Sequence, residues 1–385
     1  MYSCSSKFHQ AVASDAEQKA LLIFSDCVFT DEDISVEEGI EFHDYFNTEE
    51  DLAIGQANSN ELSFSLFNDA RLLNSYKFGD FTALLGVLIG ETGYVQTGTA
   101  SIISTKLGNR YDGYTEYPYL RRNGNAVGVQ PSFAVRSLLC YDGKIYAFGA
   151  SRQYAVYNDS NGANITSQNP VNNFMRTKAS NDWQGKGMYY NAGSRNLFIW
   201  EGGIRKQYEF VPLGCFTAER PRVPDVIQID MNCYDFMTKF DVDMPDDSTL
   251  KVSYPITLGS LLKKMCDYVG VACKSTTFIN STAQVTARPD DFESVTMRDV
   301  LKWIAEAAGS NARFDRDGKL EMAWLRSTTQ SYEATNYSDF SPTWYETKKV
   351  NKLYNRSTQD GEERTYGSGN EGYLIQDNPL LKGVN

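Results

Sequence analysis

Alternating apolar and polar residues are the first pattern visible along the chain, and they predict β-strands. Residues 61–66 read Glu-Leu-Ser-Phe-Ser-Leu, a period of two that is typical of a strand with one buried and one exposed face. Ile40 and Phe42 alternate with polar neighbours in the same way, whereas residues 81–89 are apolar almost throughout, as expected of a strand covered on both faces. Residues 21–95 therefore predict a small antiparallel barrel or sandwich.

The segment 96–215 has a different character, because it is rich in Asn, Gly, Ser and Tyr with short apolar runs between turns. Asp142-Gly143 stands between two such runs, and this dipeptide favours the tight turn of a hairpin. We predict two hairpins here, over residues 137–148 and 197–210. The segment is interpreted as an inserted β-rich module.

Three prolines, Pro212, Pro221 and Pro224, follow this module and predict a boundary, because proline cannot donate to a β-ladder. Strands are predicted to resume beyond them, at residues 226–230 and 240–242.

Residues 255–325 change to a helical period. One helix is predicted to begin after Thr257 and to end at Gly270, a typical C-terminal stop. A second is predicted to begin after Thr296, whose side chain can accept from the amide of Asp299 in a capping-box variant. Their apolar stripes are Leu258, Leu261, Leu262, Met265 and Val269 in the first helix, and Met297, Val300, Leu301, Ile304 and Ala308 in the second.

A third hairpin is predicted after these helices, with Asp317-Gly318 as its turn between residues 312–314 and 320–325. The helices and hairpin together predict a compact α+β unit. Trp303 is interpreted as a packing residue of this unit, and so is Trp324.

Composition narrows the function classes. Hydrophobic residues make up 41% and charged residues 22% of the 385, which allows a sizeable core and excludes wholesale disorder. The formal net charge of −12 disfavours a phosphate-tracking surface, so no specific nucleic-acid binding is expected. Histidine occurs only as His9 and His43, which removes most His-based metal sites and most Ser-His or Cys-His catalytic centres.

The seven cysteines are scattered and odd in number, with no C-x-x-C pair. We therefore expect reduced thiols rather than a disulfide framework or a zinc site. The longest apolar run, residues 81–90, is far shorter than the ~20 residues that span a bilayer, and no signal peptide is expected at the N-terminus.

Each small motif has a plain structural explanation that we prefer. Residues 367–372 match G-x-G-x-x-G, but a nucleotide-binding loop needs a following helix, and Pro379 argues against one. His9 and His43 are interpreted as surface residues, although His43 beside Asp44 is suited to proton transfer.

The acidic clusters lack the loop spacing that calcium requires and are interpreted as solvated turns. They are Asp31-Glu32-Asp33, Asp241-Val242-Asp243, Asp246-Asp247 and Asp290-Asp291. No catalytic, cofactor-binding or metal-binding residue is predicted, and no cofactor is expected. The 24 tyrosines fit either an adaptable recognition surface or simple strand propensity.

A larger pattern is more informative than these motifs. Residues 255–273 (beginning Pro-Ile-Thr-Leu-Gly-Ser-Leu-Leu), 296–309 and 314–322 resemble the tail hub family of bacteriophages and prophages. Members of this family are also described as tail-associated lysins or prophage endopeptidase tail proteins, and they are similar to the baseplate hub of contractile phages. Residues 52–68 and 78–81 are similar to the first barrel of that family.

The resemblance implies a fold that is mainly β with an α+β insertion, in a homotrimer that forms a collar at the tail tip. Each chain would contribute two small antiparallel β-barrels. The first is residues 1–95, and the second is split between residues 216–254 and 326–385. Residues 96–215 are the inserted β-rich module and residues 255–325 the α+β insertion with two helices and a hairpin.

The resemblance also implies partners and a location. The partners are further copies of the chain, the tail tube, the distal tail proteins and the tape-measure protein, with no membrane segment. The location is the virion tail tip, after synthesis in the bacterial cytoplasm. A ring protein needs no catalytic centre, and the lytic domain that many relatives carry is not expected before Asn385, so no enzyme activity is expected.

Two other functions stay open from the sequence. The Tyr- and Asn-rich residues 96–215 are compatible with a receptor- or carbohydrate-binding tail module. A cell-wall hydrolase that uses paired carboxylates needs no histidine, and the separation of two carboxylates is not visible in a sequence.

Overall fold

The structure of the chain is a computed structural model. It describes residues 4–25, 28–31, 33–35, 39–45, 53–67, 78–93, 100–110, 113–122, 125–127, 129–131, 137–141, 143–148, 154–165, 174–176, 187–191, 193–201, 203–224, 227–323, 352–356, 363–367 and 372–381. By their contacts, Met1–Asp33 and Ala83–Val211 form one compact unit, and Ile34–Thr82 and Pro212–Asn385 form the other. These are called the first and second units below.

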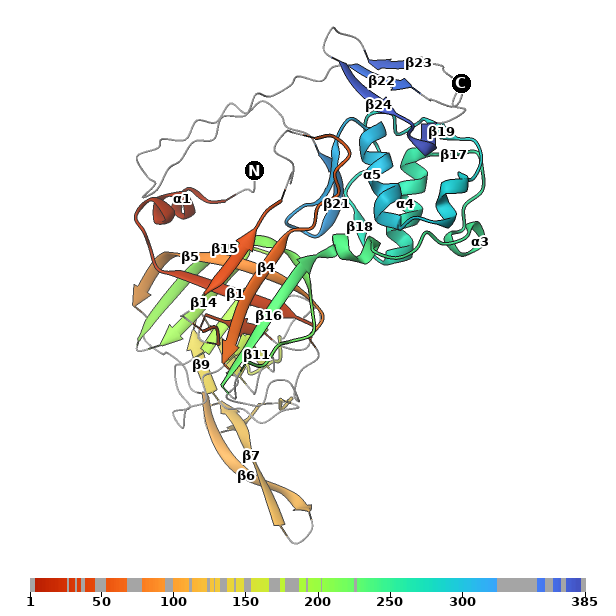
Figure 1. Ribbon diagram of the computed structural model, residues 1–385. Helices are drawn as coiled ribbons and strands as arrows, with labels where there is room; N and C mark the ends of the chain where they lie inside the picture. The colour runs from red at the N-terminus through yellow and green to blue at the C-terminus, as the bar shows by residue number, and fades with distance from the viewer. Residues whose placement is uncertain are drawn as a thin grey trace. The chain divides into compact units, whose positions relative to one another are not determined.

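The first unit is built almost entirely from strands (Figure 1). One short helix, α1 (Ser6–Ala13), precedes them, with Ser5 as its N-cap. The strands are β1 (Gln18–Phe24), β2 (Val28–Thr30), β6 (Ala100–Arg110), β7 (Gly113–Arg122), β8 (Asn125–Ala126), β9 (Ser137–Tyr141), β10 (Lys144–Phe148), β11 (Tyr154–Asn158), β12 (Phe174–Arg176), β13 (Gly187–Asn191) and β14 (Asn196–Glu201).

The second unit combines sheet strands with helices (Figure 1). Its strands are β3 (Ile40–His43), β4 (Glu61–Phe67), β16 (Gln228–Asp235), β17 (Ile256–Thr257), β18 (Ala272–Cys273), β19 (Gln284–Val285), β20 (Asn311–Phe314), β21 (Lys319–Ala323), β22 (Lys352–Arg356), β23 (Glu363–Gly367) and β24 (Gly372–Gln376). Its helices are η1 (Phe236–Phe240), α3 (Asp247–Leu250), α4 (Leu258–Val269), η2 (Asp290–Glu293), α5 (Met297–Ala307) and η4 (Pro379–Leu381).

Two long strands belong to both units, since β5 (Asp80–Gly93) and β15 (Ile204–Ala218) each begin in one and end in the other. β15 pairs with β14 over Ile204–Glu209 and with β16 over Phe216–Ala218. Pro212 lies inside β15 between these two ladders, where its missing N–H breaks neither. The division between the two units falls between Val211 and Pro212, although the strand itself continues through it.

The fold class is mainly β with largely antiparallel pairing, as predicted. Parallel pairs join β18 to β21 and β22 to β24. Among the described strands no pairing closes a sheet into a barrel, so the two barrels and the four-part division of the chain stay predictions.

The helical predictions are confirmed. The Thr257 side chain accepts from the Ser260 amide at the start of α4, and Gly270 ends that helix. Thr296 and Asp299 form a reciprocal capping box at the start of α5. Two backbone N–H groups that have no partner within the helix thereby gain hydrogen bonds, which fixes where the helix begins.

The predicted hairpins are present in the described residues. β9 pairs with β10 and β14 pairs with β15, both antiparallel. β20 pairs with β21 around Gly318. Gly318 has a φ of +72°, and an added Cβ there would lie 2.8 Å from Cys215, so this turn requires glycine.

One strand prediction is wrong. Residues 240–242 were expected to be a strand, but Phe240 ends the 3-10 helix η1 and Asp241 caps it. The Asp235 side chain accepts from the Met237 amide and starts this helical turn. Met237 and Phe240, three residues apart, both point into the core, a spacing that suits one turn of 3-10 helix.

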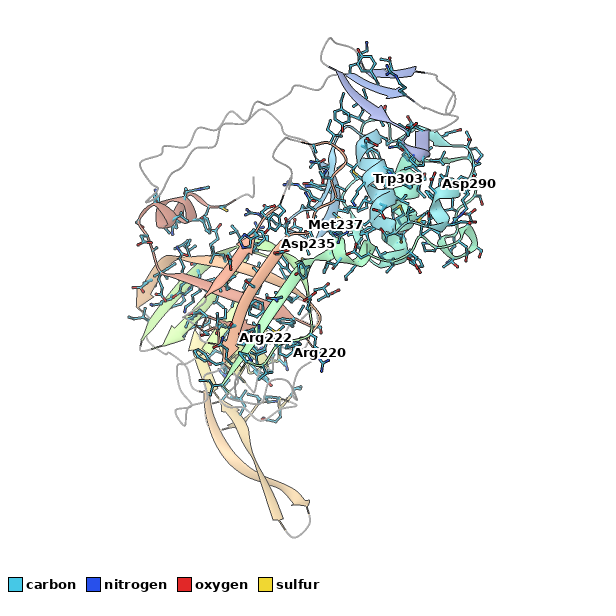
Figure 2. The ribbon with its side chains drawn as sticks, in the orientation of Figure 1. Arg220, Arg222, Asp235, Met237, Asp290 and Trp303 are labelled. Atoms are coloured by element: carbon cyan, nitrogen blue, oxygen red, sulfur yellow. The ribbon has the colours of Figure 1, made fainter. Side chains whose placement is uncertain are left out.

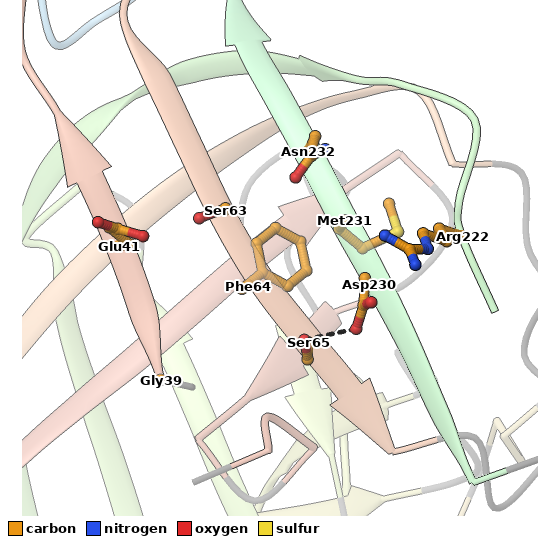
Figure 3. A pocket seen from close by; sticks show the side chains of 9 residues that line it. All are labelled: Gly39, Glu41, Ser63, Phe64, Ser65, Arg222, Asp230, Met231 and Asn232. Atoms are coloured by element: carbon orange, nitrogen blue, oxygen red, sulfur yellow. Dashed lines mark hydrogen bonds between the residues drawn. The ribbon is translucent and has the colours of Figure 1, made fainter. Parts of the chain in front are cut away.

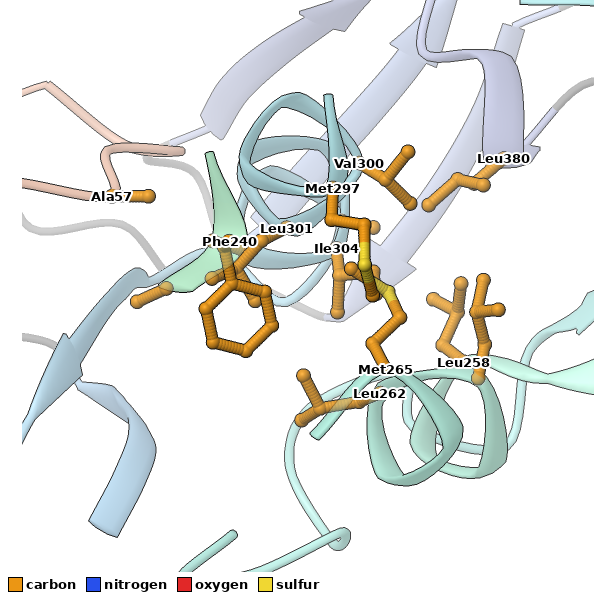
Figure 4. Close-up of a cluster of buried hydrophobic side chains, with 14 of the residues drawn as sticks. Ala57, Phe240, Leu258, Leu262, Met265, Met297, Val300, Leu301, Ile304 and Leu380 are labelled. Carbon is orange, nitrogen blue, oxygen red and sulfur yellow. The ribbon is translucent and has the colours of Figure 1, made fainter. Parts of the chain in front are cut away.

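The main core of the second unit lies between α4 and α5 (Figure 4). Leu262 and Met265 of α4 face Leu301 and Ile304 of α5, and all four side chains are fully buried. Phe240 and Leu380 close the same cluster. Burying each such aliphatic side chain contributes about 1.5–3 kcal/mol, so this core holds the α+β unit together.

The first unit has smaller cores. One joins Tyr208 and Phe210 of β15 to Leu21, Leu84, Tyr190 and Leu197. The buried Tyr208 hydroxyl donates to Glu17 at 2.9 Å, and Lys206 also donates to Glu17 at 2.6 Å. Burial opposes ionisation of Glu17, but the hydrogen bonds from Lys206 and Tyr208 prevail and lower its pKa.

Candidate functional site

One sheet face in the second unit gathers polar side chains from three strands that lie far apart in the sequence. β4 pairs antiparallel with β16 on one side and with β3 on the other. Leu62, Phe64 and Leu66 of β4 are buried, so Ser63 lies on the opposite, outward face. Residues 61–64 alternate between partly exposed and buried as predicted, whereas Ser65 is buried along with its neighbours, at 1% exposure.

The strand register places these outward residues in two rows. In the first row, Glu41 of β3 is opposite Ser63 of β4, which is opposite Asn232 of β16. In the second row, Ser65 of β4 is opposite Asp230 of β16. Figure 3 shows the three strands side by side with these side chains between them.

A short segment after β15 extends the second row. Arg222 and Asp230 form an isolated antiparallel bridge, in which each amide donates to the other's carbonyl at 3.0 Å and 2.8 Å. Arg220 lies two residues earlier, and both arginines are exposed (Figure 2). The outward face therefore carries cationic as well as anionic groups.

The rows line a cavity of about 360 Å3. That volume lies in the range of about 300–1,000 Å3 that small-molecule sites occupy. The lining residues are Gly39, Glu41, Ser63, Phe64, Ser65, Arg222, Asp230, Met231 and Asn232. Because most of their side chains are polar, the cavity suits a hydrogen-bonding occupant rather than an apolar one.

Asp230 is held in a fixed orientation. Ser65 Oγ and Gln228 Nε2 both donate to Asp230 Oδ1, each at 2.8 Å. In the described part of the chain, Asp230 Oδ2 has no hydrogen-bond partner. One carboxylate oxygen thus positions the side chain and the other is available to a ligand.

The two histidines lie in exposed positions. His43 is on β3, where its Nε2 is 3.0 Å from Glu41 Oε1 and its ring stacks on Tyr45. His9 is on α1, a helix that the sequence pattern did not predict, and its ring meets Phe8 edge to face. Among the residues that the structure describes, these side-chain contacts of the two histidines are with Glu41, Tyr45 and Phe8, and none involves a serine or cysteine.

The acidic clusters serve local structure where they are described. Asp31 pairs with Lys19, and Asp33 accepts from the Thr30 amide. Asp246 caps α3. Hydrogen bonds from Ser248 and from the Thr249 amide and hydroxyl lower the pKa of Asp246 to about 2.

Other residues of the clusters make ion pairs or lie in a helical turn, and Asp243 forms an isolated β-bridge with Thr296. Asp241 pairs with Arg298, and Asp247 pairs with Arg288. Asp290 begins the 3-10 helix η2. Within the described residues no group of three or more His, Cys, Asp or Glu side chains is placed to hold a metal ion.

The glycine motif does not begin a helix. Gly367 ends β23 and Gly372 begins β24, so the two outer glycines belong to the two outer strands of one small sheet, on either side of β22. Five cysteines are free thiols in the described part of the chain, namely Cys4, Cys215, Cys233, Cys266 and Cys273. Across the described residues, no helix is long and apolar enough to cross a membrane.

A buried carboxyl group was missed by the sequence analysis. The Asp235 side chain is 3% exposed and accepts from Ser59 Oγ, the Asn60 amide and the Met237 amide. Burial raises its pKa to about 6 against the opposing effect of these hydrogen bonds. The sequence signal for this role is its position just before a helical turn, since Asp is a favoured N-cap residue.

Comparison with known proteins does not identify a family for the chain. No family model matches the chain, and no curated protein matches it. Among solved structures it is similar to the 43 kDa tail protein of prophage MuSo2 from Shewanella oneidensis, with 8% sequence identity and a TM-score of 0.33. That match covers 93% of this chain and 71% of the other, and at this level of likeness it assigns no function.

Proposed function

We propose that this chain is a structural subunit of a phage or prophage tail tip, a baseplate hub protein that joins the tail tube to the distal tip. The observation that carries the proposal is that the three segments on which the family resemblance rests pack together in the structure. Residues 255–273, 296–309 and 314–322 fold into α4, α5 and the β20–β21 hairpin around one continuous core. A resemblance spread over three sequence segments thus corresponds to one packed body.

In this proposal three copies form a collar, and each supplies two barrel-like β modules. An exposed sheet edge supports an assembly role. β3 ends the strand order β16-β4-β3, and among the described strands none pairs with its outer edge. Unpaired strand edges invite pairing with another chain unless they are protected, and closed rings arise when such contacts repeat around an axis.

The partners in this proposal are further copies of the chain, the tail tube, the distal tail proteins and the tape-measure protein. The function is mechanical, so the proposal includes no reaction. Several acidic side chains among the described residues act as helix caps or ion-pair partners, a structural role that fits the proposal.

Deletion of the gene in its inducible prophage tests the proposal. We expect induced cells to accumulate filled heads without functional tails, with wild-type chain supplied from a plasmid restoring tails. Purified particles should contain the chain by mass spectrometry. Normal infectious particles that lack the chain would contradict the proposal.

The mass of the purified chain tests the collar. Analytical ultracentrifugation with purified tube protein is expected to show a species containing three copies of the 43.3 kDa chain. A chain that stays monomeric in that mixture would contradict the trimer, while the deletion phenotype separately tests the tail role.

A further inference from the structure

We propose that the cavity on the outward face of β3, β4 and β16 binds an uncharged saccharide. This goes beyond a structural role in a tail, because it gives one face of the second unit a ligand of its own. The proposal rests on the types of polar group in the cavity, their spacing across the strands, and the orientation of Asp230.

The lining offers both hydrogen-bond donors and acceptors. Glu41 and Asp230 accept, Arg222 donates, and the Asn232 amide does both. Ser63 adds a hydroxyl group between them, whereas the buried Ser65 hydroxyl already donates to Asp230. A sugar hydroxyl donates one hydrogen bond and accepts others, so a hydroxyl-rich ligand can satisfy such a mixed lining, whereas a ligand with one type of group cannot.

The spacing of the groups fits a ligand that spans strands. Residues directly opposite each other on neighbouring strands have Cβ atoms about 4.5–5.5 Å apart. Glu41, Ser63 and Asn232 form such a row, and Ser65 with Asp230 forms the next. Hydroxyl groups on different sides of one sugar ring can therefore reach different strands.

The same geometry argues against an ion as the occupant. Glu41 on β3 and Asp230 on β16 are separated by the whole of β4. Neighbouring strands are about 4.8 Å apart, so the two carboxylates are too distant to coordinate one metal ion. An anion would meet Glu41 and Asp230 as well as Arg222, and the lining thus has no excess of positive charge to attract it.

Two polar groups are free for a ligand. The Asp230 carboxylate is fixed through Oδ1 by Ser65 and Gln228, which leaves Oδ2 without a partner in the described residues. The Arg222 guanidinium likewise has no ion-pair partner among them, and its side chain lies beside Asp230 in Figure 3. A carboxylate oxygen and a guanidinium side by side can bind adjacent sugar hydroxyls as acceptor and donor.

An apolar surface lies next to the polar rows. Phe67 follows Ser65 by two residues on the same face of β4, and it is 41% exposed. Sugar rings present C–H groups that pack on aromatic rings, and aromatic side chains with a polar neighbourhood are well suited to such contacts. Phe67 does not line the cavity itself, but it offers a packing surface two residues beyond Ser65 on the same strand.

A glycan array of uncharged oligosaccharides, including chitotriose and maltotriose, tests the proposal with the full chain. We expect binding to at least one glycan, and a loss of affinity of at least tenfold in Asp230→Ala and in Arg222→Ala. The matched controls Asp243→Ala and Arg316→Ala change exposed residues outside the cavity and should bind as the wild type does. Asp230→Asn, which retains an oxygen for Ser65, serves as a second variant if Asp230→Ala unfolds.

Three outcomes would overturn the proposal. The first is no binding of the wild type to any glycan, and the second is binding that the cavity variants leave unchanged. The third is a change in oligomeric mass in Asp230→Ala and Arg222→Ala without a change in glycan binding, which would assign this face to contact between copies. None of these outcomes affects the tail role, which the prophage deletion tests separately.

Discussion

The ring of Phe210 occupies the space into which a side chain on Gly86 would project. A Cβ built on Gly86 would lie 2.6 Å from ring atoms of Phe210, a separation far inside van der Waals contact. Phe210 is 1% exposed and belongs to the core of the first unit. β5 therefore approaches β15 closely at this point only because residue 86 has no side chain.

We predict that Gly86→Ala destabilises the first unit. Overpacking of a tight core costs about 1–3 kcal/mol, and Phe210 has no solvent-facing position to move into. Gly90→Ala is the matched control, because Gly90 lies on the same strand and its Cβ would meet nothing within 4 Å. Urea unfolding should separate the two variants, and equal stabilities would contradict the close approach.

A buried carboxyl group makes stability depend on pH near neutrality. Asp235 has a pKa of about 6 in the folded chain, above the 3.8 of a solvated Asp, so folding favours its protonated form. This contribution to stability is present below pH 3.8 and is lost as the pH rises through 6. The full difference between the two pKa values corresponds to about 3 kcal/mol, most of which is lost between pH 4 and pH 8.

Asp235→Asn is the test of this effect. The variant is expected to be less stable at every pH, because the Asn amide group replaces an oxygen that accepts from backbone amides. Its free energy of unfolding should nevertheless fall less than that of the wild type between pH 4 and pH 8. Parallel pH profiles from urea unfolding would show that Asp235 does not titrate in this range.

The helices could be predicted from the sequence because their determinants are local. Thr257 and Gly270 bound α4, and the capping box of Thr296 and Asp299 begins α5. Each involves residues within one turn of the helix end. η1 was misread because Phe240 and Val242 alternate as in a strand, while the group that starts the helical turn is the buried side chain of Asp235.

The candidate site could be predicted only in part. The alternation over residues 61–66 indicates that Ser63 and Ser65 share a face, but not what lies beside them. Ser65 bonds to Asp230, 165 residues later, and Glu41 joins the same face through β3. Strand register is set by tertiary packing, so a single sequence does not reveal which polar residues become neighbours.

The capping box of α5 predicts a measurable loss on truncation. Thr296→Ala removes the acceptor for the Asp299 amide, at 3.2 Å, and the hydroxyl that contacts Asp299 Oδ2 at 2.7 Å. Loss of such a cap costs about 1 kcal/mol. Thr296→Ser keeps the hydroxyl and should retain nearly all of the stability in urea unfolding, whereas an equal loss in both variants would point to the methyl group instead.

The Glu17 side chain contributes to stability in two ways that can be separated, through its charge and as the hydrogen-bond acceptor of Tyr208. Its pKa is lowered in the folded chain, so its ionic contribution is present above the pKa of a solvated Glu and is lost as the pH falls through the folded pKa. The side chain is 41% exposed, and solvent screening limits this ionic contribution to less than about 1 kcal/mol. Glu17→Gln should therefore be only slightly less stable at pH 7. Its free energy of unfolding should also change less with pH on the acidic side than that of the wild type.

Glu17→Ala should be more harmful than Glu17→Gln, because it leaves the buried Tyr208 hydroxyl without its acceptor. An unsatisfied buried polar group costs about 1–3 kcal/mol, whereas the Gln oxygen can still accept. Adding Tyr208→Phe to Glu17→Ala removes that hydroxyl and should recover part of the loss in urea unfolding. If the double variant is no more stable than Glu17→Ala, the loss comes from the packing of the Glu17 side chain and not from an orphaned hydroxyl.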